Sequence, residues 1–272
     1  MYSRAPVRTA AGGFIVIASI CLSGCATLPD GSRWGENAGF RVGWDRTADA
    51  AMQAAKSPWV WAPLVTAAAL QIDNADHHIS DWAVDHTPVY GSVAGAHNAS
   101  DDLEMAAGVV YLASVLAAPS GDSGPEWWSA KLQGGLVGLG AVAATELTTE
   151  VIKVGANRQR PNGGDNSMPS GHTSFAAVAD TMTGRNLEAI PMSRAARTTL
   201  TMGVDLLTFS TGWARVEAGA HFPSDVLVGM SIGNFFGRMF DDAFLGDDLA
   251  QRLTLSFAPE PRGGAILWSL RF

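Results

Sequence analysis

The segment "NSMPSGHTSFAAVA", residues 166–179, is the most informative stretch of this chain. The residues before it, "RPNGGD" at 160–165, predict a loop, because proline, asparagine and paired glycines interrupt regular structure. Small, helix-compatible residues follow His172. Ser170, Gly171 and His172 therefore stand where a loop enters a helix, and the free N–H groups and helix dipole at such a junction favour an anion. A histidine at that junction suggests chemistry on the anion.

The composition is that of a folded protein without affinity for nucleic acid. The 272 residues are 47% hydrophobic and only 16% charged, which argues against extended disorder. The formal net charge is −8, so the chain as a whole does not attract polyanions. Any anion that it binds must be held by a local cluster of lysine and arginine. We expect no nucleic-acid partner.

The N-terminus predicts an exported protein. Two arginines precede the apolar run "AGGFIVIASICL", which is typical of a signal peptide over residues 1–24. The sequence "LSGC" that ends at Cys25 resembles the lipobox of bacterial lipoproteins, which implies cleavage before Cys25 and a lipid on that residue. A plain cleaved signal or an uncleaved anchor is the alternative. The resemblance implies a lipid-anchored protein on the periplasmic side of the cell envelope. Ala26 replaces the aspartate that often retains lipoproteins in the inner membrane, so we expect the protein to be in the outer membrane.

The middle of the chain predicts an all-α fold. After a tether over 25–56 that ends in a short helix, residues 57–245 contain alanine-rich helical segments separated by polar loops. We expect residues 57–245 to form a helical bundle with about six core helices. The predicted helices cover 59–72, 102–118, 129–154, 171–183, 194–211 and 225–241.

Two further segments indicate whether a helix could span a membrane and what the C-terminal residues form. The longest stretch without Asp, Glu, Lys or Arg after the signal is 105–121, with 17 residues, whereas a membrane-spanning helix needs about 20. We therefore interpret the apolar helices as buried in the bundle, with room for shallow membrane contact. Over 246–272, apolar residues alternate on both sides of a proline- and glycine-rich turn, which predicts a short C-terminal β-hairpin.

Cations and histidines recur between residues 153 and 225. Lys153 and Arg160 are seven residues apart, so in a continuous helix both would share one face about 10 Å apart. Arg215 precedes His221 by six residues, and Asp225 follows four later, where it can reach back from the first turn of a helix to fix the histidine tautomer. This inventory suits phosphoryl transfer without a cofactor. Three converging cations would repel a divalent metal, so no metal site is expected.

These residues form three ordered motifs: K-x6-RP (Lys153, Arg160, Pro161), PSGH (Pro169, Ser170, Gly171, His172) and R-x5-H-x3-D (Arg215, His221, Asp225). The motifs resemble the three signatures of the type 2 phosphatidic acid phosphatase family. Its superfamily also includes vanadium haloperoxidases and bacterial class A acid phosphatases. The resemblance implies a helical bundle with the site among its core helices. It also implies metal-independent hydrolysis of a phosphate monoester or pyrophosphate through a phosphohistidine.

The resemblance assigns a role to each motif residue. His221 would be the nucleophile, Asp225 would hold its imidazole, and His172 would be the general acid for the leaving alcohol. The phosphoryl oxygens would be bound by Lys153, Arg160, Arg215, the Ser170 hydroxyl and the Gly171 N–H. Ala214 stands where the family usually has serine, so one hydroxyl near Arg215 is missing.

The expected substrate follows from the predicted anchor. An enzyme held beside a bilayer would act on a phosphorylated lipid or an isoprenoid pyrophosphate, although a soluble phosphate stays open. Two other interpretations remain: a vanadate-dependent haloperoxidase in which His221 ligates vanadate, and a non-catalytic envelope binding protein. The modest chain length and the lipobox argue against the first. The intact His172, His221 and Asp225 argue against the second.

Several residues outside the motifs carry weaker expectations. The acids and histidines of "DNADHHISDWAVDH", residues 73–86, are interpreted as a solvated helix end and loop and not as a metal site. Ser100 is expected to cap the helix that follows it. Arg158 is a candidate neighbour of the site, and Glu217 is expected to pair with an arginine.

Overall fold

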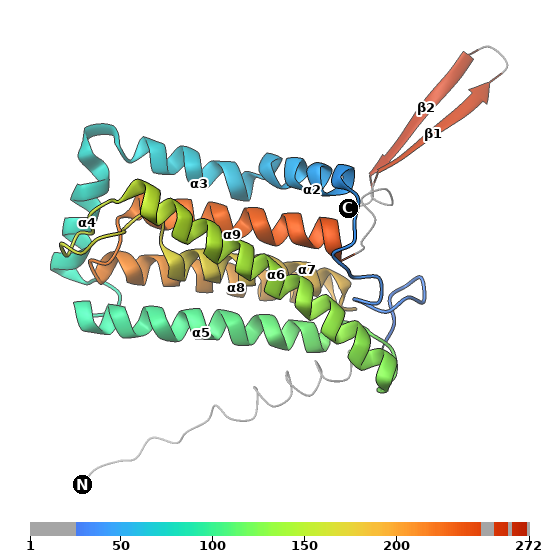
Figure 1. Ribbon diagram of the computed structural model, residues 1–272, viewed down its shortest axis with the longest axis horizontal. Coiled ribbons are helices and arrows are strands. Elements are labelled where there is room, and N and C mark those ends of the chain that lie inside the picture. Colours follow the sequence, from blue (N-terminus) through green and yellow to red (C-terminus); the bar gives the residue numbers. More distant parts are fainter. Residues whose placement is uncertain (1–25, 246–252, 261–262, 271–272) are drawn as a thin grey trace, which may run out of the picture.

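The computed structural model describes residues 26–245, 253–260 and 263–270 (Figure 1). The predicted signal at 1–24, Cys25 and parts of the tail lie outside the described residues. The helices are α2 (Trp44–Lys56), α3 (Pro58–Ala69), α4 (Ala75–His86), α5 (Val93–Ala117), α6 (Pro125–Ala156), α7 (Gly171–Ala189), α8 (Arg194–Glu217) and α9 (Pro223–Phe244), with a 3-10 turn, η1, at Ile72–Asn74. Strands β1 (Leu253–Glu260) and β2 (Gly263–Leu270) pair antiparallel.

The predicted all-helical bundle is confirmed for residues 44–244, and the largest differences from the predicted helices are in α5 and α4. Helix α5 begins at Val93, well before the predicted residue 102. Its cap is Ser92, whose hydroxyl accepts a hydrogen bond from the Gly95 N–H at 2.9 Å. Residues 75–86 form the full helix α4, which was expected to be a helix end and loop. Asn74 interrupts the chain before α4 with a φ of 58°.

Helix α7 is the centre of the bundle. It contacts α5, α6, α8 and α9. Figure 1 shows α5 along the lower edge and α2 and α3 along the upper edge, with α7, α8 and α9 between them, α4 at the left side and α6 crossing the view diagonally. Small residues allow this packing: Ala176 and Val178 of α7 are fully buried against Ala141 of α6 and Ala107 of α5.

Helices α7 and α9 are in backbone contact along a row of glycines at every fourth position of α9. A Cβ atom on Gly229 would lie 2.6 Å from the carbonyl oxygen of Ser170. One on Gly233 would lie 2.7 Å from the Ala177 Cβ and would also collide with the Ser174 carbonyl oxygen. The small residues therefore set the distance between the two helix axes.

We expect Gly233→Ala to lower the free energy of unfolding by about 1–3 kcal/mol, because the added methyl group forces two backbones apart. Gly203 of α8 supplies a matched control, since a Cβ there meets no atom within 4 Å. Gly203→Ala should raise stability by about 0.5–1 kcal/mol through helix propensity. Chemical unfolding followed by circular dichroism measures both. Equal stability of the two variants would contradict the close contact.

The segment before α3 packs on the bundle. Trp34 is only 6% exposed and belongs to the main core. The ring of Phe40 lies 5.3 Å from that of Phe244, and Arg46 donates to the Asp242 carbonyl oxygen at 3.2 Å. Residues 34–56, which were expected to include a tether, thus cover the C-terminal half of α9.

The expectation of buried apolar helices is wrong for one side of α5 and of α6. Both helices expose a row of large apolar residues at helical spacing. These rows are Met105, Val109, Leu112 and Leu116 on α5, and Leu132, Leu136, Leu139, Leu147, Val151 and Val154 on α6. Within the described residues, α6 alone is long and apolar enough to cross a membrane, and only 28% of its most apolar window is buried. The bundle core therefore does not cover these rows.

Candidate active site

The residues of the three motifs meet at one end of the bundle, where several helix termini converge. His172 lies in the first turn of α7, and Asp225 lies in the first turn of α9. Lys153 and Arg215 lie in the last turns of α6 and α8. Positive helix N-termini and basic side chains therefore face the same region.

Lys153 and Arg160 do not share one continuous helix, so the spacing of two helical turns does not apply to them. Helix α6 ends at Ala156, and Asn157 follows with a φ of 43°, which is left-handed. Arg160 lies in the next loop, where its Nε donates to the Asp165 carbonyl oxygen at 2.9 Å. The two cations therefore come to the site from different backbone segments.

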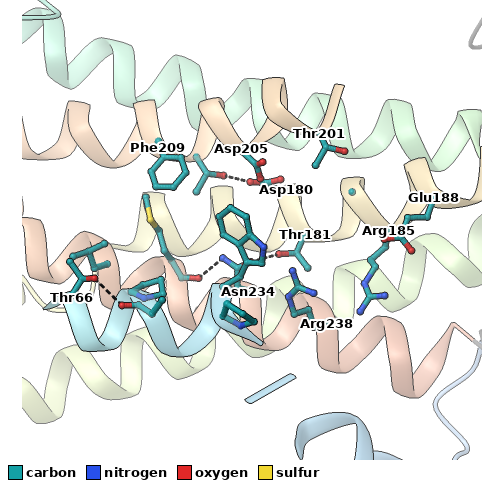
Figure 2. A pocket seen from close by; sticks show the side chains of 18 of the residues that line it. Thr66, Asp180, Thr181, Arg185, Glu188, Thr201, Asp205, Phe209, Asn234 and Arg238 are labelled. Carbon is teal, nitrogen blue, oxygen red and sulfur yellow. Dashed lines mark hydrogen bonds between the residues drawn. The ribbon is translucent and has the colours of Figure 1, made fainter. Parts of the chain in front are cut away.

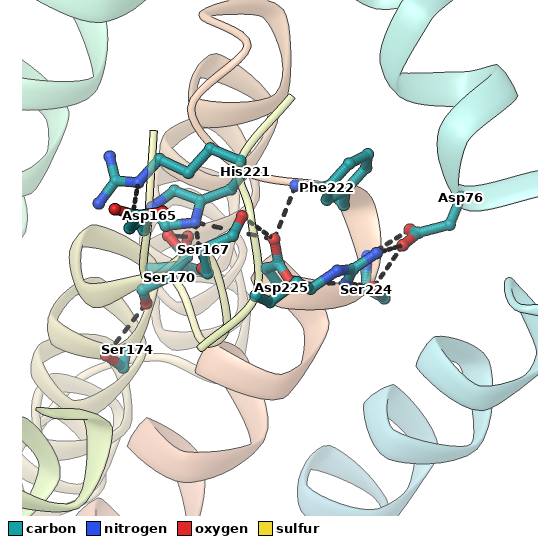
Figure 3. Close-up of polar contacts among 12 residues, drawn as sticks. Asp76, Asp165, Ser167, Ser170, Ser174, His221, Phe222, Ser224 and Asp225 are labelled. Carbon is teal, nitrogen blue, oxygen red and sulfur yellow. Dashed lines mark hydrogen bonds and ion pairs between the residues drawn. The ribbon is translucent and has the colours of Figure 1, made fainter. Parts of the chain in front are cut away.

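His221 is buried and held in one tautomer. Its side chain is 3% exposed, and its Nδ1 lies 2.5 Å from the carbonyl oxygen of Ser167 (Figure 3). A carbonyl oxygen can only accept, so Nδ1 carries the proton and Nε2 keeps its lone pair. The predicted direct bond to Asp225 is absent, because the nearest carboxylate oxygen is 3.9 Å from Nδ1. The Ser167 carbonyl oxygen, and not the Asp225 carboxylate, therefore accepts the hydrogen bond from Nδ1.

The electrostatic surroundings of His221 favour its neutral form. Burial lowers its pKa well below the usual value, and the charges of Arg215, Arg160 and Lys153 lower it further. The three cations of the motifs thus act on the same imidazole although they come from three segments. At neutral pH, Nε2 is an uncharged nitrogen with a free lone pair facing a positive environment.

Asp225 supports His221 through Ser167. Its Oδ2 accepts from the Ser167 hydroxyl at 2.5 Å and from the Phe222 N–H at 2.9 Å (Figure 3). Arg158 donates to its Oδ1 at 2.7 Å. Burial raises the pKa of Asp225, whereas these hydrogen bonds and the Arg158 charge oppose that rise. The carboxylate fixes both chain segments that flank the imidazole.

Arg158 links Asp225 to a second buried carboxylate, that of Asp76. Arg158 also donates to Asp76 at 2.7 Å, and Asp76 is 1% exposed. The Ser224 N–H and hydroxyl donate to the same carboxylate at 2.8 and 2.6 Å. Burial opposes ionisation of Asp76, but these bonds lower its pKa overall. The expectation that this residue lies on a solvated helix end is therefore wrong.

Among the described residues, no group of three or more His, Cys, Asp or Glu side chains is placed to hold a metal ion.

The remaining phosphate-binding candidates lie around the start of α7. Arg215 is 4% exposed, and its Nη1 donates to the Ser100 hydroxyl at 3.0 Å. Its Nε is buried with no hydrogen-bond partner among the residues described here. The Lys153 Nζ lies 3.2 Å from the point where a Cβ on Gly171 would stand. The buried hydroxyl of Ser170 lies 2.9 Å from that of Thr173.

His172 contacts two acids that the motifs do not include. Its Nε2 lies 2.9 Å from Asp101 and 3.4 Å from Glu104, both on α5. Ser100 lies inside α5 and does not cap it, so that expectation is wrong. Among the residues that the structure describes, Glu217 pairs with no arginine: it accepts from the N–H groups of residues 89 and 90 and from the Trp213 indole.

Two comparisons with known proteins concern the family of one segment and the fold. Residues 162–241 match the family model described as the PAP2 superfamily, a range that includes the second and third motifs. A solved structure described as the first transmembrane PAP2 type phosphatidylglycerolphosphate phosphatase from Bacillus subtilis shares the fold, with a TM-score of 0.51. The two chains are 23% identical, and the match covers 67% of this chain and 92% of that one. None of the curated proteins is similar enough in sequence to count as a match.

The second and third motifs lie in a segment, residues 162–241, that is similar to the PAP2 superfamily, and the helical fold is shared with the Bacillus subtilis structure.

Proposed function

We propose that this protein is a metal-independent phosphatase that hydrolyses a phosphate monoester or pyrophosphate of a lipid through a phosphohistidine on His221. The observation that carries the proposal is the state of this imidazole. It is buried, it donates from Nδ1 to a backbone carbonyl, and it is surrounded by three cations. A neutral histidine with a free Nε2 lone pair is a nucleophile, and the cations suit the phosphoryl oxygens.

In the first step, Nε2 of His221 attacks phosphorus, and the bond from phosphorus to the leaving oxygen breaks. Lys153, Arg160 and Arg215 neutralise the phosphoryl oxygens, and the N-terminus of α7 adds N–H donors. His172, whose Nε2 lies 2.9 Å from Asp101, gives its proton to the leaving oxygen.

In the second step, a water molecule attacks the phosphohistidine. His172, now neutral, accepts the water proton, the N–P bond breaks, and inorganic phosphate leaves. Both histidines return to their starting protonation states. No redox or metal step is required.

The apolar rows on α5 and α6 support a lipid substrate. The α6 row from Leu132 to Val154 ends beside Lys153, and the α5 row begins at Met105, next to Glu104. At 1.5 Å per residue, the α6 row is about 33 Å long, close to the thickness of a bilayer's hydrocarbon core. Membrane contact along these rows would bring the phosphate site to the lipid headgroups. The name of the Bacillus subtilis neighbour, a phosphatidylglycerolphosphate phosphatase, agrees with a phospholipid substrate.

The predicted lipid anchor fits the same arrangement. We propose a signal peptide at 1–24, a lipid on Cys25 and a phosphatase domain over 57–245 on the periplasmic side of the envelope, with the outer membrane as its address. The anchor would keep the apolar rows beside a bilayer, so both features serve the same substrate class.

The test is phosphate release by the full-length protein in detergent, with EDTA present. Phosphatidic acid, an isoprenoid pyrophosphate and a soluble aromatic phosphate are the substrates. We expect release to persist in EDTA and a lipid to be the best substrate. The acid limb of kcat/KM should lie below pH 6.5, because neutral His221 attacks and its lowered pKa delays its protonation as the pH falls.

Each part of the proposal can fail separately. Loss of release in EDTA would contradict the metal-independent mechanism. An acid limb at or above pH 6.5 would contradict a buried, neutral His221. Faster hydrolysis of the soluble phosphate than of either lipid would contradict the lipid substrate while leaving the phosphatase intact.

A further inference from the structure

A cavity of about 420 Å³ lies between α3, α7, α8 and α9, away from the motif residues (Figure 2). Asp180 on its wall is eight residues beyond His172 on α7, which places it about 12 Å further along the helix. A Cβ on Gly212 would touch Val226 and Met230, so α8 and α9 are closely packed between the cavity and the motif residues. The cavity is therefore separate from the phosphate site.

Two carboxylates from different helices share one wall of the cavity. Figure 2 shows Asp180 of α7 beside Asp205 of α8. Asp180 accepts a hydrogen bond from the Thr208 hydroxyl at 3.0 Å. Burial and the charge of Asp205 raise the pKa of Asp180 to about 7, and burial raises the pKa of Asp205, although the charge of Arg238 opposes both rises. Two desolvated carboxylates are stabilised by a cation that donates hydrogen bonds.

A guanidinium from α9 lines the same cavity. Arg238 is half-buried, and its Nε has no hydrogen-bond partner within the described chain. Burial and the charge of Arg185 lower the pKa of Arg238, because both disfavour an additional positive charge. A buried donor without an acceptor is costly, so an anion at this wall would stabilise it.

The mouth of the cavity is apolar. Trp59 of α3 and Phe209 of α8 line it and are 46% and 49% exposed. Pro58, Pro63 and Leu227 complete the apolar lining. An occupant would thus meet opposite charges inside and an apolar surface at the rim.

We propose that this cavity binds the head group of a zwitterionic amphiphile, with a primary ammonium on Asp180 and Asp205, a phosphate on Arg238 and the acyl chain leaving past Trp59. Phosphoethanolamine lipids have this chemistry. Their ammonium supplies three N–H donors, which a trimethylated choline lacks. The site binds a lipid that is not a substrate, since a phosphodiester offers no phosphate monoester to the catalytic histidines.

The experiment is isothermal titration of the full-length protein with short-chain lysophosphatidylethanolamine. We expect binding at least tenfold tighter than that of the matching lysophosphatidylcholine and lysophosphatidylglycerol. Phosphoethanolamine without an acyl chain should also bind more weakly. Asp205→Asn and Arg238→Met should each weaken binding of the ethanolamine lipid at least tenfold. Asp49→Asn and Arg41→Met, on exposed residues, are the matched controls and should leave it unchanged.

Phosphate release by the same variants shows whether they are folded, so a loss of lipid binding in an active variant cannot be attributed to misfolding. Both cavity variants should keep their hydrolysis rates, because the cavity lies apart from the motif residues. Equal binding of the ethanolamine and choline lipids, equal binding of free phosphoethanolamine, or full affinity in both active cavity variants would overturn the proposal. The phosphatase proposal is unaffected by any of these outcomes, since it is tested by release alone.

Discussion

His221→Ala will lower phosphate release by about 10⁴-fold or more, which is the scale of losing a nucleophile that acts together with a general acid. Without Nε2, no nitrogen–phosphorus bond can form, although the three cations still bind the phosphate. The variant should therefore lose kcat with little change in substrate affinity. Steady-state assays with a phosphorylated lipid, together with equilibrium binding of inorganic phosphate, measure the two effects.

A matched control is available in α4. His78 is exposed and belongs to no motif, so His78→Ala should hydrolyse at the wild-type rate. Rapid quenching with a substrate labelled at the phosphate should trap an alkali-stable phosphoprotein in the His78→Ala variant and none in the His221→Ala variant. Trapped label in the His221→Ala protein would place the nucleophile elsewhere.

The largest expected loss of stability follows the removal of Arg158. Its guanidinium contacts Asp76 and Asp225, which are 1% and 0% exposed. Arg158→Met leaves both carboxylates buried without their cation, and breaking a buried pair in this way costs about 3–5 kcal/mol. Chemical unfolding followed by tryptophan fluorescence measures the change. Activity should also fall, because Asp225 holds the Ser167 segment beside His221.

Two comparisons identify the cause of that loss. Glu126→Ala removes the Arg33–Glu126 pair, whose side chains are 33% and 73% exposed, and should cost no more than about 1 kcal/mol. Asp76→Asn in the Arg158→Met background removes one of the two buried charges and should recover part of the stability. If the Arg158 and Glu126 variants were equally stable, the buried network would contribute no more to the free energy of unfolding than the Arg33–Glu126 pair does.

The sequence predicted the bundle and the motif residues because both depend on local patterns. Apolar periodicity identifies α6 to α9, and the PSGH segment marks the start of α7. Helix α4 was missed because its sequence is polar on several faces and contains no clear apolar row. The role of Asp76 could not be foreseen, since it depends on Arg158, which is 82 residues away in the chain.

Other parts of the site are invisible to sequence patterns for different reasons. The group that fixes the His221 tautomer is a backbone carbonyl, and any residue at position 167 carries one. Asp101 and Glu104 are three residues apart, a helical spacing that could have suggested one acidic face, but α5 was predicted to begin after Asp101. Composition also showed which helices are apolar without showing that the rows on α5 and α6 face outward.

The glycine row between α7 and α9 has a consequence for how the enzyme can move. Both helices begin at the phosphate site, with His172 in the first turn of α7 and His221 just before α9. The close contact at Gly229 and Gly233 leaves the two helices little room to slide against each other, so the distance between the proposed nucleophile and the proposed acid is set before substrate arrives. We therefore expect any opening that admits a bulky substrate to come from the 157–170 loop or from α5, while the separation of the two proposed catalytic histidines stays constant.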